Sequence, residues 1–157
     1  MKIEGEYLFD GPRQDLWQLV RDPQVLASCM PGTQSVQKVS DTQYTGELQV
    51  HIGPIAGNFG GQLFVTNEVP PASCTLTVEG KGKIGFLKGV GNIDMTEQEE
   101  NKTLMKYTGE VQIGGKVASV GQRLFDTVSK GMIKQGLDKL NEILQARLKD
   151  TSAGRAS

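Results

Sequence analysis

The chain has 157 residues, of which 17 are Lys or Arg and 18 are Asp or Glu, so its formal net charge is −1. This length predicts one domain with its own hydrophobic core, and the near-neutral charge argues against a nucleic-acid binder, which would carry a basic patch. No run of apolar residues approaches the ~20 that a membrane-spanning helix needs, whereas glycine is unusually frequent at 20 residues.

The first thirty residues or so predict one strand and two short helices. Residues 2–9 alternate between apolar and polar side chains, which is the pattern of a strand. Pro12 suits the first turn of a helix that continues to Val20. A second short helix is predicted over residues 24–29, and Pro31-Gly32 ends it.

Strand patterns dominate residues 34–113, where apolar and polar residues alternate and short turn sequences separate the runs. Successive strands joined by short turns predict an antiparallel meander. Residues 117–148 are helical in composition, and we expect one domain over 1–150 and a disordered polar tail over 151–157. The order of elements predicts an α+β fold, with a curved antiparallel sheet of about seven strands wrapped around a long C-terminal helix.

Glycines recur at strand positions that face the predicted helix, at Gly5, Gly46, Gly61 and Gly109. A glycine inside a strand removes a side chain from the core and weakens the strand. One interpretation is that the missing side chains leave a cavity. The other is that glycine permits strong coiling of the sheet or a close approach of the covering helix, and the same residues can serve both purposes.

The apolar residues of the C-terminal helix recur every four residues from Val120 to Leu148, with Gly136 in one gap. Because four residues turn an α-helix by slightly more than one full turn, this stripe drifts around the helix axis. We therefore expect either that the sheet wraps around the helix or that the helix bends near Gly131 or Gly136.

The glycine-rich segment 80–91 matches the pattern G-x-G-x-x-G, but no strand–helix–strand unit surrounds it, so a dinucleotide site is rejected. Two interpretations remain. In one, Phe86 and Leu87 form the apolar tip of a flexible loop with a rim of lysines, which gates a cavity or touches an anionic membrane. In the other, the segment is an ordinary hairpin whose apolar pair folds inward.

The residues offer no catalytic or metal-binding constellation. His51 is the only histidine, and its strand position places it on the face away from the helix. Cys29 and Cys74 lie far apart, so we expect two free thiols in a reduced, cytoplasmic protein. Without a second histidine or a cysteine pair, neither a zinc site nor a cysteine nucleophile with a histidine base is expected.

Several segments together resemble one known family. They are Asp22-Pro23 followed by Cys29-Met30-Pro31-Gly32, the run 53–59, the stretch 80–91 and the most specific block, 111–124. Over about residues 1–148 the chain resembles the CoxG family of carbon monoxide dehydrogenase subunits, within the START-like (SRPBCC) polyketide cyclase and lipid-transport superfamily. The resemblance implies the helix-grip fold and a non-catalytic accessory role beside a molybdenum-containing hydroxylase that oxidises carbon monoxide or a related substrate.

The resemblance also implies membrane recruitment of that enzyme and transport of a hydrophobic quinone. Some members of the family carry an apolar C-terminal extension, whereas this chain ends in a short polar segment, so we expect transient rather than stable membrane contact. The expected protein is cytoplasmic and peripheral to the inner face of the membrane, and it binds a quinone or another lipid between helix and sheet without a cofactor. The alternatives are a START-like cyclase or hydrolase and a ligand-free assembly factor.

The residues expected to bind the ligand are those on the inner strand positions, the segment 80–91 and the start of the long helix. They are Tyr44, Gly46, Phe59, Gly61, Leu63, Phe86, Leu87, Tyr107, Gly109, Leu124 and Val128.

Overall fold

The computed structural model describes residues 1–30 and 32–156, with side chains described up to residue 150. The elements are β1 (Lys2–Phe9), α1 (Arg13–Val20), α2 (Pro23–Cys29), β2 (Thr33–Ser40), β3 (Gln43–Ile52), β4 (Ile55–Val69), β5 (Ser73–Gly82), β6 (Gly85–Gln98), η1 (Glu99–Asn101), β7 (Lys102–Gly114), η2 (Gly115–Val120) and α3 (Gln122–Ala156). The predicted helix end at Pro31 lies outside the described residues. The boundary at residue 150 and the disordered tail stay predictions.

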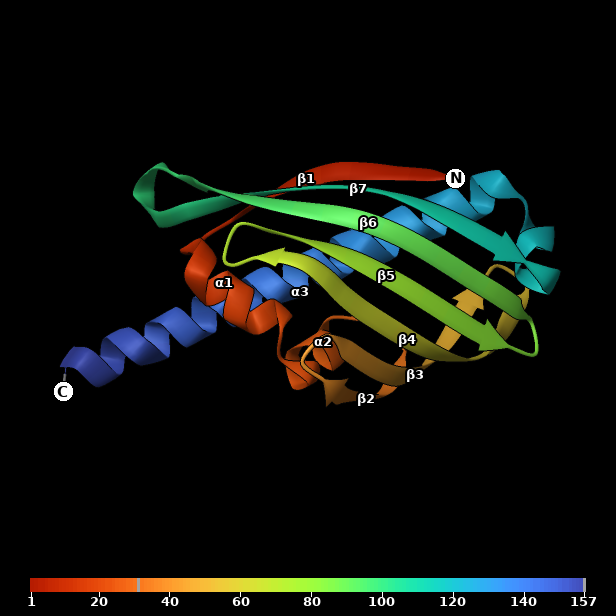
Figure 1. Cartoon of the computed structure of the whole chain (residues 1–157), viewed down its shortest axis with the longest axis horizontal. Helices are drawn as coiled ribbons and strands as arrows, with labels where there is room; N and C mark the ends of the chain where they lie inside the picture. Colours follow the sequence, from red (N-terminus) through yellow and green to blue (C-terminus); the bar gives the residue numbers. More distant parts are fainter. Residues whose placement is uncertain (31, 157) are drawn as a thin grey trace.

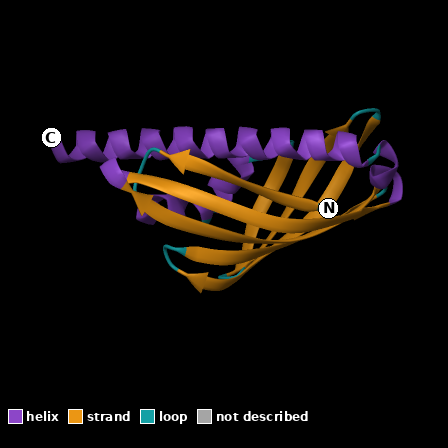
Figure 2. Cartoon of the chain, turned by 90° about the horizontal axis from the view of Figure 1, so that it is seen from above, coloured by secondary structure: helices purple, strands orange, loops and turns teal. Residues whose placement is uncertain are grey.

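The seven strands form one antiparallel sheet in the order β1-β7-β6-β5-β4-β3-β2. The meander from β2 to β7 follows from the short turns, and β1 is added at the far edge beside β7 (Figure 1). The sheet is strongly curved, and α3 runs along its concave side (Figure 2). The predicted α+β helix-grip architecture is confirmed.

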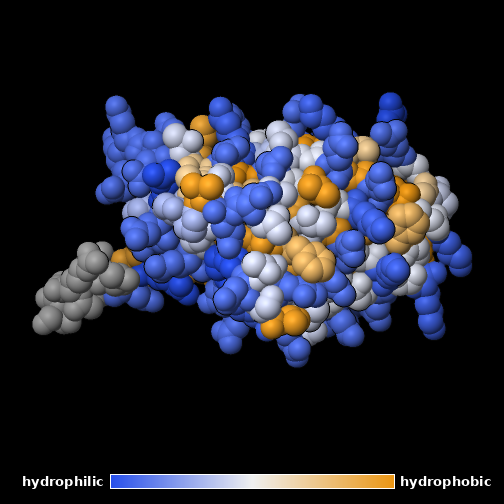
Figure 3. Space-filling view, viewed as in Figure 1, coloured by the Kyte–Doolittle hydropathy of each residue, from blue (hydrophilic) through white to orange (hydrophobic). Residues whose placement is uncertain are grey.

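Burial along the strands follows the predicted alternation. In β3 the inward residues Tyr44, Val50 and Ile52 are buried, whereas His51 is exposed on the opposite face. The outer face of the sheet is largely hydrophilic, with isolated apolar side chains (Figure 3). The sheet therefore has one apolar face, and α3 with α1 and α2 covers it.

The segment 80–91 is a hairpin, so the flexible-loop interpretation is wrong. β5 and β6 stay paired as far as Gly82 and Gly85, and only two residues form the turn. Neighbouring residues of a strand point to opposite faces. Phe86 is accordingly 40% exposed on the outer face, and Leu87 faces the helix and packs with the inner apolar residues.

Among its described residues, helix α3 packs firmly near its start and around Leu140 and Leu144, and less firmly between these two regions. Phe125 is buried near the helix start, and Leu140 and Leu144 are buried further along. No residue from 126 to 139 is fully buried. Around Gly136 the neighbour is α2, since a Cβ there would lie 3.1 Å from the carbonyl oxygen of Cys29.

Tyr7 joins β1 to the second half of α3. Its hydroxyl donates a hydrogen bond of 2.6 Å to the Oδ1 atom of Asp138. Burial, followed by the hydrogen bond and the negative charge of Asp138, raises the pKa of Tyr7 to about 12. A raised pKa means that the neutral phenol is stabilised in the folded state, and this stabilisation is lost when the phenol ionises.

We expect Tyr7→Phe to lower the free energy of unfolding by about 1 kcal/mol at neutral pH, because the ring stays and only the hydrogen bond is lost. The difference from the wild type should shrink as the pH rises from the ordinary tyrosine value of about 10 towards about 12. Urea unfolding of both proteins between neutral pH and the highest pH at which they fold measures this difference. A difference that stays constant or grows over that range would contradict the prediction.

Candidate functional site: an apolar cavity under the helix

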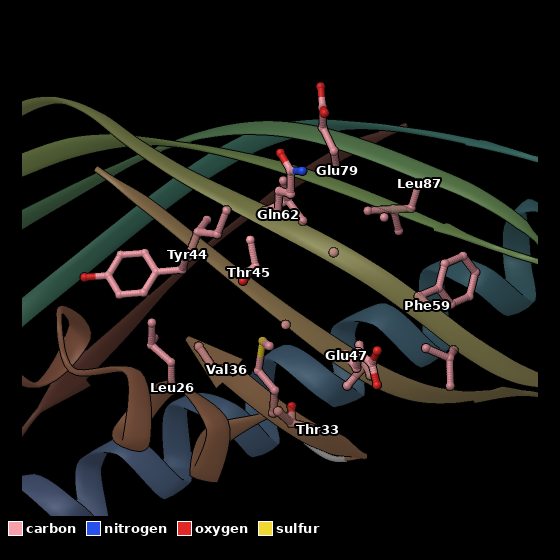
Figure 4. Close-up of a pocket in the computed structure, with 18 of the residues that line it drawn as sticks. Leu26, Thr33, Val36, Tyr44, Thr45, Glu47, Phe59, Gln62, Glu79 and Leu87 are labelled. Carbon is pink, nitrogen blue, oxygen red and sulfur yellow. The ribbon is translucent and has the colours of Figure 1, made fainter. Parts of the chain in front are cut away.

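A half-open cavity of about 360 Å³ lies between the inner face of β2–β6, α2, η2 and the start of α3. Its exposed wall is almost entirely apolar. Leu26 and Tyr44 lie at one end, and Phe59 and Leu87 lie at the other (Figure 4). The lining residues are Leu26, Met30, Thr33, Ser35, Val36, Tyr44, Thr45, Gly46, Glu47, Leu48, Val50, Ile52, Phe59, Gly61, Gln62, Leu63, Leu76, Val78, Glu79, Gly80, Leu87, Val117 and Phe125.

Three glycines form a row across the floor of this cavity. Gly46 of β3 pairs with Gly61 of β4, and Gly61 pairs with Gly80 of β5. All three face the helix and line the cavity. A Cβ on Gly61 would have its nearest neighbour at 3.5 Å, so no neighbouring atom requires glycine at this position. The absent side chains leave the space that the cavity occupies.

The remaining inward glycines serve the shape of the sheet. The ring of Tyr107 lies over Gly5 and fills the space that a side chain there would take. A Cβ on Gly109 would lie 3.0 Å from the carbonyl oxygen of Val90 and 3.3 Å from the Cα of Gly91, its partner on β6. Both interpretations of the glycines therefore apply. The row on β3–β5 leaves a cavity, and close backbone approach is permitted by the β6–β7 pair and also by Gly46, where a Cβ would lie 2.7 Å from the carbonyl oxygen of Ser35.

The cavity separates two apolar clusters of the core. One contains Phe59 and Phe125 near the start of α3, and the other contains Tyr44 beside α2. Met30 and Val78 line the space yet remain 44% and 38% exposed, because no side chain packs in front of them. In a well-packed core these side chains would meet neighbours, so the space is a partly open cavity and a candidate binding site.

Two polar side chains of the lining, Tyr44 and Glu79, are either hydrogen-bonded to backbone or turned away from the cavity. The hydroxyl of Tyr44 donates a hydrogen bond of 2.6 Å to the carbonyl oxygen of Arg21, and burial raises its pKa. The carboxylate of Glu79 points away from the cavity (Figure 4). No Lys, Arg or His is among the described lining residues. The titratable residues of the described lining are Tyr44, Glu47 and Glu79, with no cationic side chain beside them.

The two cysteines are free thiols, as expected; Cys29 is half-buried and Cys74 is buried. Burial raises the pKa of both, and that of Cys74 reaches about 11. A thiol with a raised pKa is a poor nucleophile near neutral pH. Neither residue lines the cavity.

Six of the eleven residues predicted to bind a ligand line the cavity. They are Tyr44, Gly46, Phe59, Gly61, Leu63 and Leu87. The other five do not line it: Phe86, Tyr107, Gly109, Leu124 and Val128.

The five have separate reasons for lying elsewhere. Phe86 is on the outer face because it precedes the inward Leu87 in a strand. Tyr107 covers Gly5, and Gly109 lies against the backbone of β6. Leu124 and Val128 pack into the cluster around Phe125.

The prediction also missed lining residues. Strand alternation alone would have added the inward residues Leu48, Val50, Ile52, Leu76, Val78 and Gly80. Leu26, Met30, Val117 and Phe125 come from helical segments, and their placement depends on the path of the chain between elements. No sequence period identifies such residues.

Metal centres and membrane spans are two further features that bear on function. Over residues 1–30 and 32–156 no group of three or more His, Cys, Asp or Glu side chains is placed to hold a metal ion. None of the helices in this part of the chain combines the length and the apolar character needed to cross a membrane.

Comparison with known proteins identifies the same fold. The family model for CoxG, a subunit of carbon monoxide dehydrogenase, matches residues 5–145. A conserved protein from Geobacillus kaustophilus is 29% identical, with a TM-score of 0.88 over 93% of this chain and 96% of that chain. No curated protein matched the chain.

Two more distant structures share the fold alone. The Zhui aromatase/cyclase from Streptomyces sp. R1128 is 11% identical, with a TM-score of 0.70 over 94% of this chain and 95% of that chain. A START superfamily protein from Mycobacterium smegmatis is 9% identical, with a TM-score of 0.69 over 92% and 97% of the two chains.

Proposed function

Because the chain belongs to the CoxG family of carbon monoxide dehydrogenase subunits, we propose that it is an accessory protein that carries a quinone or another uncharged lipid. The carrier serves a membrane-associated, molybdenum-containing hydroxylase. The observation that carries this proposal is the apolar cavity of about 360 Å³ with its glycine floor. Its volume lies within the range of small-molecule sites.

The chemistry of the wall supports an uncharged, largely hydrocarbon ligand. Each Å² of apolar surface removed from water contributes about 25 cal/mol, before the entropic costs of association are subtracted. A carboxylate or phosphate inside the cavity would lose its hydration without meeting a cation, since the described wall has none. A quinone with an isoprenoid tail meets these requirements, and a fatty-acid anion does not.

Catalysis and ligand-free assembly are less well supported. A cyclase or hydrolase needs convergent acid, base or nucleophilic groups, whereas the hydroxyl of Tyr44 is already bonded to a backbone carbonyl. A ligand-free assembly factor would gain stability from filling the space over Gly61, where a Cβ has no neighbour closer than 3.5 Å.

Extraction and titration test the carrier proposal. We expect organic extraction of the purified protein, followed by mass spectrometry, to release a quinone or a neutral lipid. The delipidated protein should then bind decylubiquinone saturably, with quenching of the fluorescence of Trp17, which packs beside the clusters at the cavity end. No co-purified lipid together with no saturable binding would contradict the proposal.

The partner enzyme and the membrane contact need separate experiments. We expect the quinone-loaded protein to accelerate electron transfer from a molybdenum-containing carbon monoxide dehydrogenase to membrane vesicles that contain a terminal oxidase. We also expect cell fractionation to leave the protein mainly in the cytoplasm, with a minor share at the membrane. Equal rates with and without the carrier would contradict the partner assignment while leaving ligand binding intact.

A further inference from the structure

Thr33 lines the cavity, and its hydroxyl is a buried polar atom without a hydrogen bond. Three buried side-chain polar atoms of the described residues lack a hydrogen bond: Arg13 Nε, Arg21 Nη1 and Thr33 Oγ1. The two arginine atoms are ion-paired, with Glu97 at 3.5 Å and Glu68 at 3.1 Å. Thr33 Oγ1 is therefore the one of the three with neither a hydrogen bond nor an ion pair. This oxygen has almost no accessible surface and does not face the open space, although Thr33 itself lines the cavity. Such an atom calls for a physical explanation.

A β-bulge turns Thr33 towards the cavity. On β3 the inward residues Leu48 and Gly46 are two positions apart, and their partners on β2 are Thr33 and Val36, which are three positions apart. The extra residue in β2 is Gln34, which is exposed. Without the bulge, side chains would alternate between the two faces along β2, and Gln34 would face inward like Val36. Bulges are often found where a strand must redirect a functional side chain.

The neighbouring backbone holds Thr33 in this position. Its N–H donates to the carbonyl oxygen of Met30 at 3.2 Å, and the carbonyl of Gly32 accepts from Gln49 at 2.9 Å. Gly32 has φ +82° and packs against the backbone of Gln49 too closely for any Cβ. Since β2 is an edge strand, Thr33 lies at the rim of the cavity, beside Val36 (Figure 4).

We infer that Thr33 is the polar anchor of the ligand site and that it selects lipids with one uncharged hydrogen-bonding head, such as a carbonyl. The head lies at the rim, and the hydrocarbon tail lies over Gly46, Gly61 and Gly80. Rotation about χ1 between staggered positions brings the hydroxyl to the cavity side, where it donates to the ligand oxygen. This inference rests on the proposed function and adds the class of head group and the residue that recognises it.

Thr33→Val tests the inference, because valine keeps the shape of threonine and loses the hydroxyl. The probes are undecyl methyl ketone and its analogue in which a methylene group replaces the carbonyl oxygen, each measured by displacement of Nile red from the delipidated protein. We expect Thr33→Val to weaken ketone binding roughly fivefold, because this is the change in affinity that the loss of one typical hydrogen bond produces. Binding of the methylene analogue should not change.

Thr77→Val is the matched control, since Thr77 lies on the outer face of β5 and outside the cavity lining. It should leave the affinity for both probes unchanged. The melting temperature of ligand-free Thr33→Val should equal or exceed that of the wild type, because a buried unpaired hydroxyl is removed.

Each of the other outcomes has a distinct meaning. Equal ketone affinity in Thr33→Val and the wild type would overturn the role of Thr33, as would an equal loss for both probes, which would indicate a change of shape. Failure of the wild type to bind Nile red or either probe would overturn the proposed function itself, and the anchor with it.

Discussion

Gly61→Leu is expected to weaken binding of decylubiquinone roughly tenfold or more. The new side chain would project from the middle of the glycine row into a cavity of about 360 Å³. The position of its Cβ is free of steric conflict, since the nearest atom is 3.5 Å away. The variant should fold normally, and its melting temperature should equal or exceed that of the wild type, because it fills space and replaces a strand glycine.

Gly60→Leu provides the matched control for this experiment. Gly60 is the preceding residue of β4 and faces outward, and a Cβ there has no neighbour within 4 Å. Both variants make the same chemical change in the same strand, and only Gly61→Leu fills the cavity. Fluorescence titration of both, with melting curves in parallel, separates loss of binding from loss of folding.

One result would contradict the hypothesis that the ligand lies over the glycine floor of the cavity. If Gly61→Leu melts like the wild type and binds the quinone with unchanged affinity, the ligand does not occupy the space above Gly46, Gly61 and Gly80. The inward glycines of β3–β5 would then serve only the curvature of the sheet.

Leu144→Ala is expected to lower the free energy of unfolding by about 3 kcal/mol, because it leaves a void among fully buried residues. Leu144 is 0% exposed and packs with Phe9, Leu16 and Leu140 in the cluster beneath the second half of α3. Urea unfolding monitored by circular dichroism measures the change.

Met132→Ala makes a similar truncation in the same helix, between the buried residues Phe125 and Leu140. Met132 is only half-buried and belongs to none of the three core clusters, so its loss should cost less than about 1 kcal/mol. Equal losses for the two variants would contradict the conclusion that α3 packs mainly near Phe125 and around Leu140 and Leu144.

Much of the fold could be predicted because alternation and turn residues are local signals. The inward series Tyr44, Gly46, Leu48 and Val50 follows directly from period two along β3. The hairpin over residues 80–91 was harder to predict, because glycines at Gly80, Gly82, Gly85, Gly89 and Gly91 replace many of the side chains that would display the alternation.

The spacing by four predicted the inward face of α3 along most of its length but not the most buried residue at its start. That series started at Val120, which belongs to the 3₁₀ helix η2, and α3 begins only after Gly121, whose φ is +89°. Just after this break Phe125 is buried and Leu124 only partly so, whereas Leu140 and Leu144 of the same series are buried. A local spacing rule contains no information on such a break.

The role of Thr33 depends on pairing between strands. Alternation along β2 predicts an inward Gln34, and the register shift against β3 brings Thr33 inward instead. The shift is fixed by contacts of Gly32 and Gln49, which are distant in sequence. The lining residue with a buried, unpartnered hydroxyl was therefore the least accessible to sequence reasoning.

If the protein carries a ligand as proposed, the floor of Gly46, Gly61 and Gly80 also determines how the empty cavity behaves before a ligand enters. Pockets bounded by long side chains can collapse when those chains change rotamer, and reopening them costs free energy. A floor of paired main chain has no rotamers, and its strands are held apart by their ladder of hydrogen bonds. This part of the cavity is preorganised. A ligand would not have to order it on binding, so little binding free energy would be spent there.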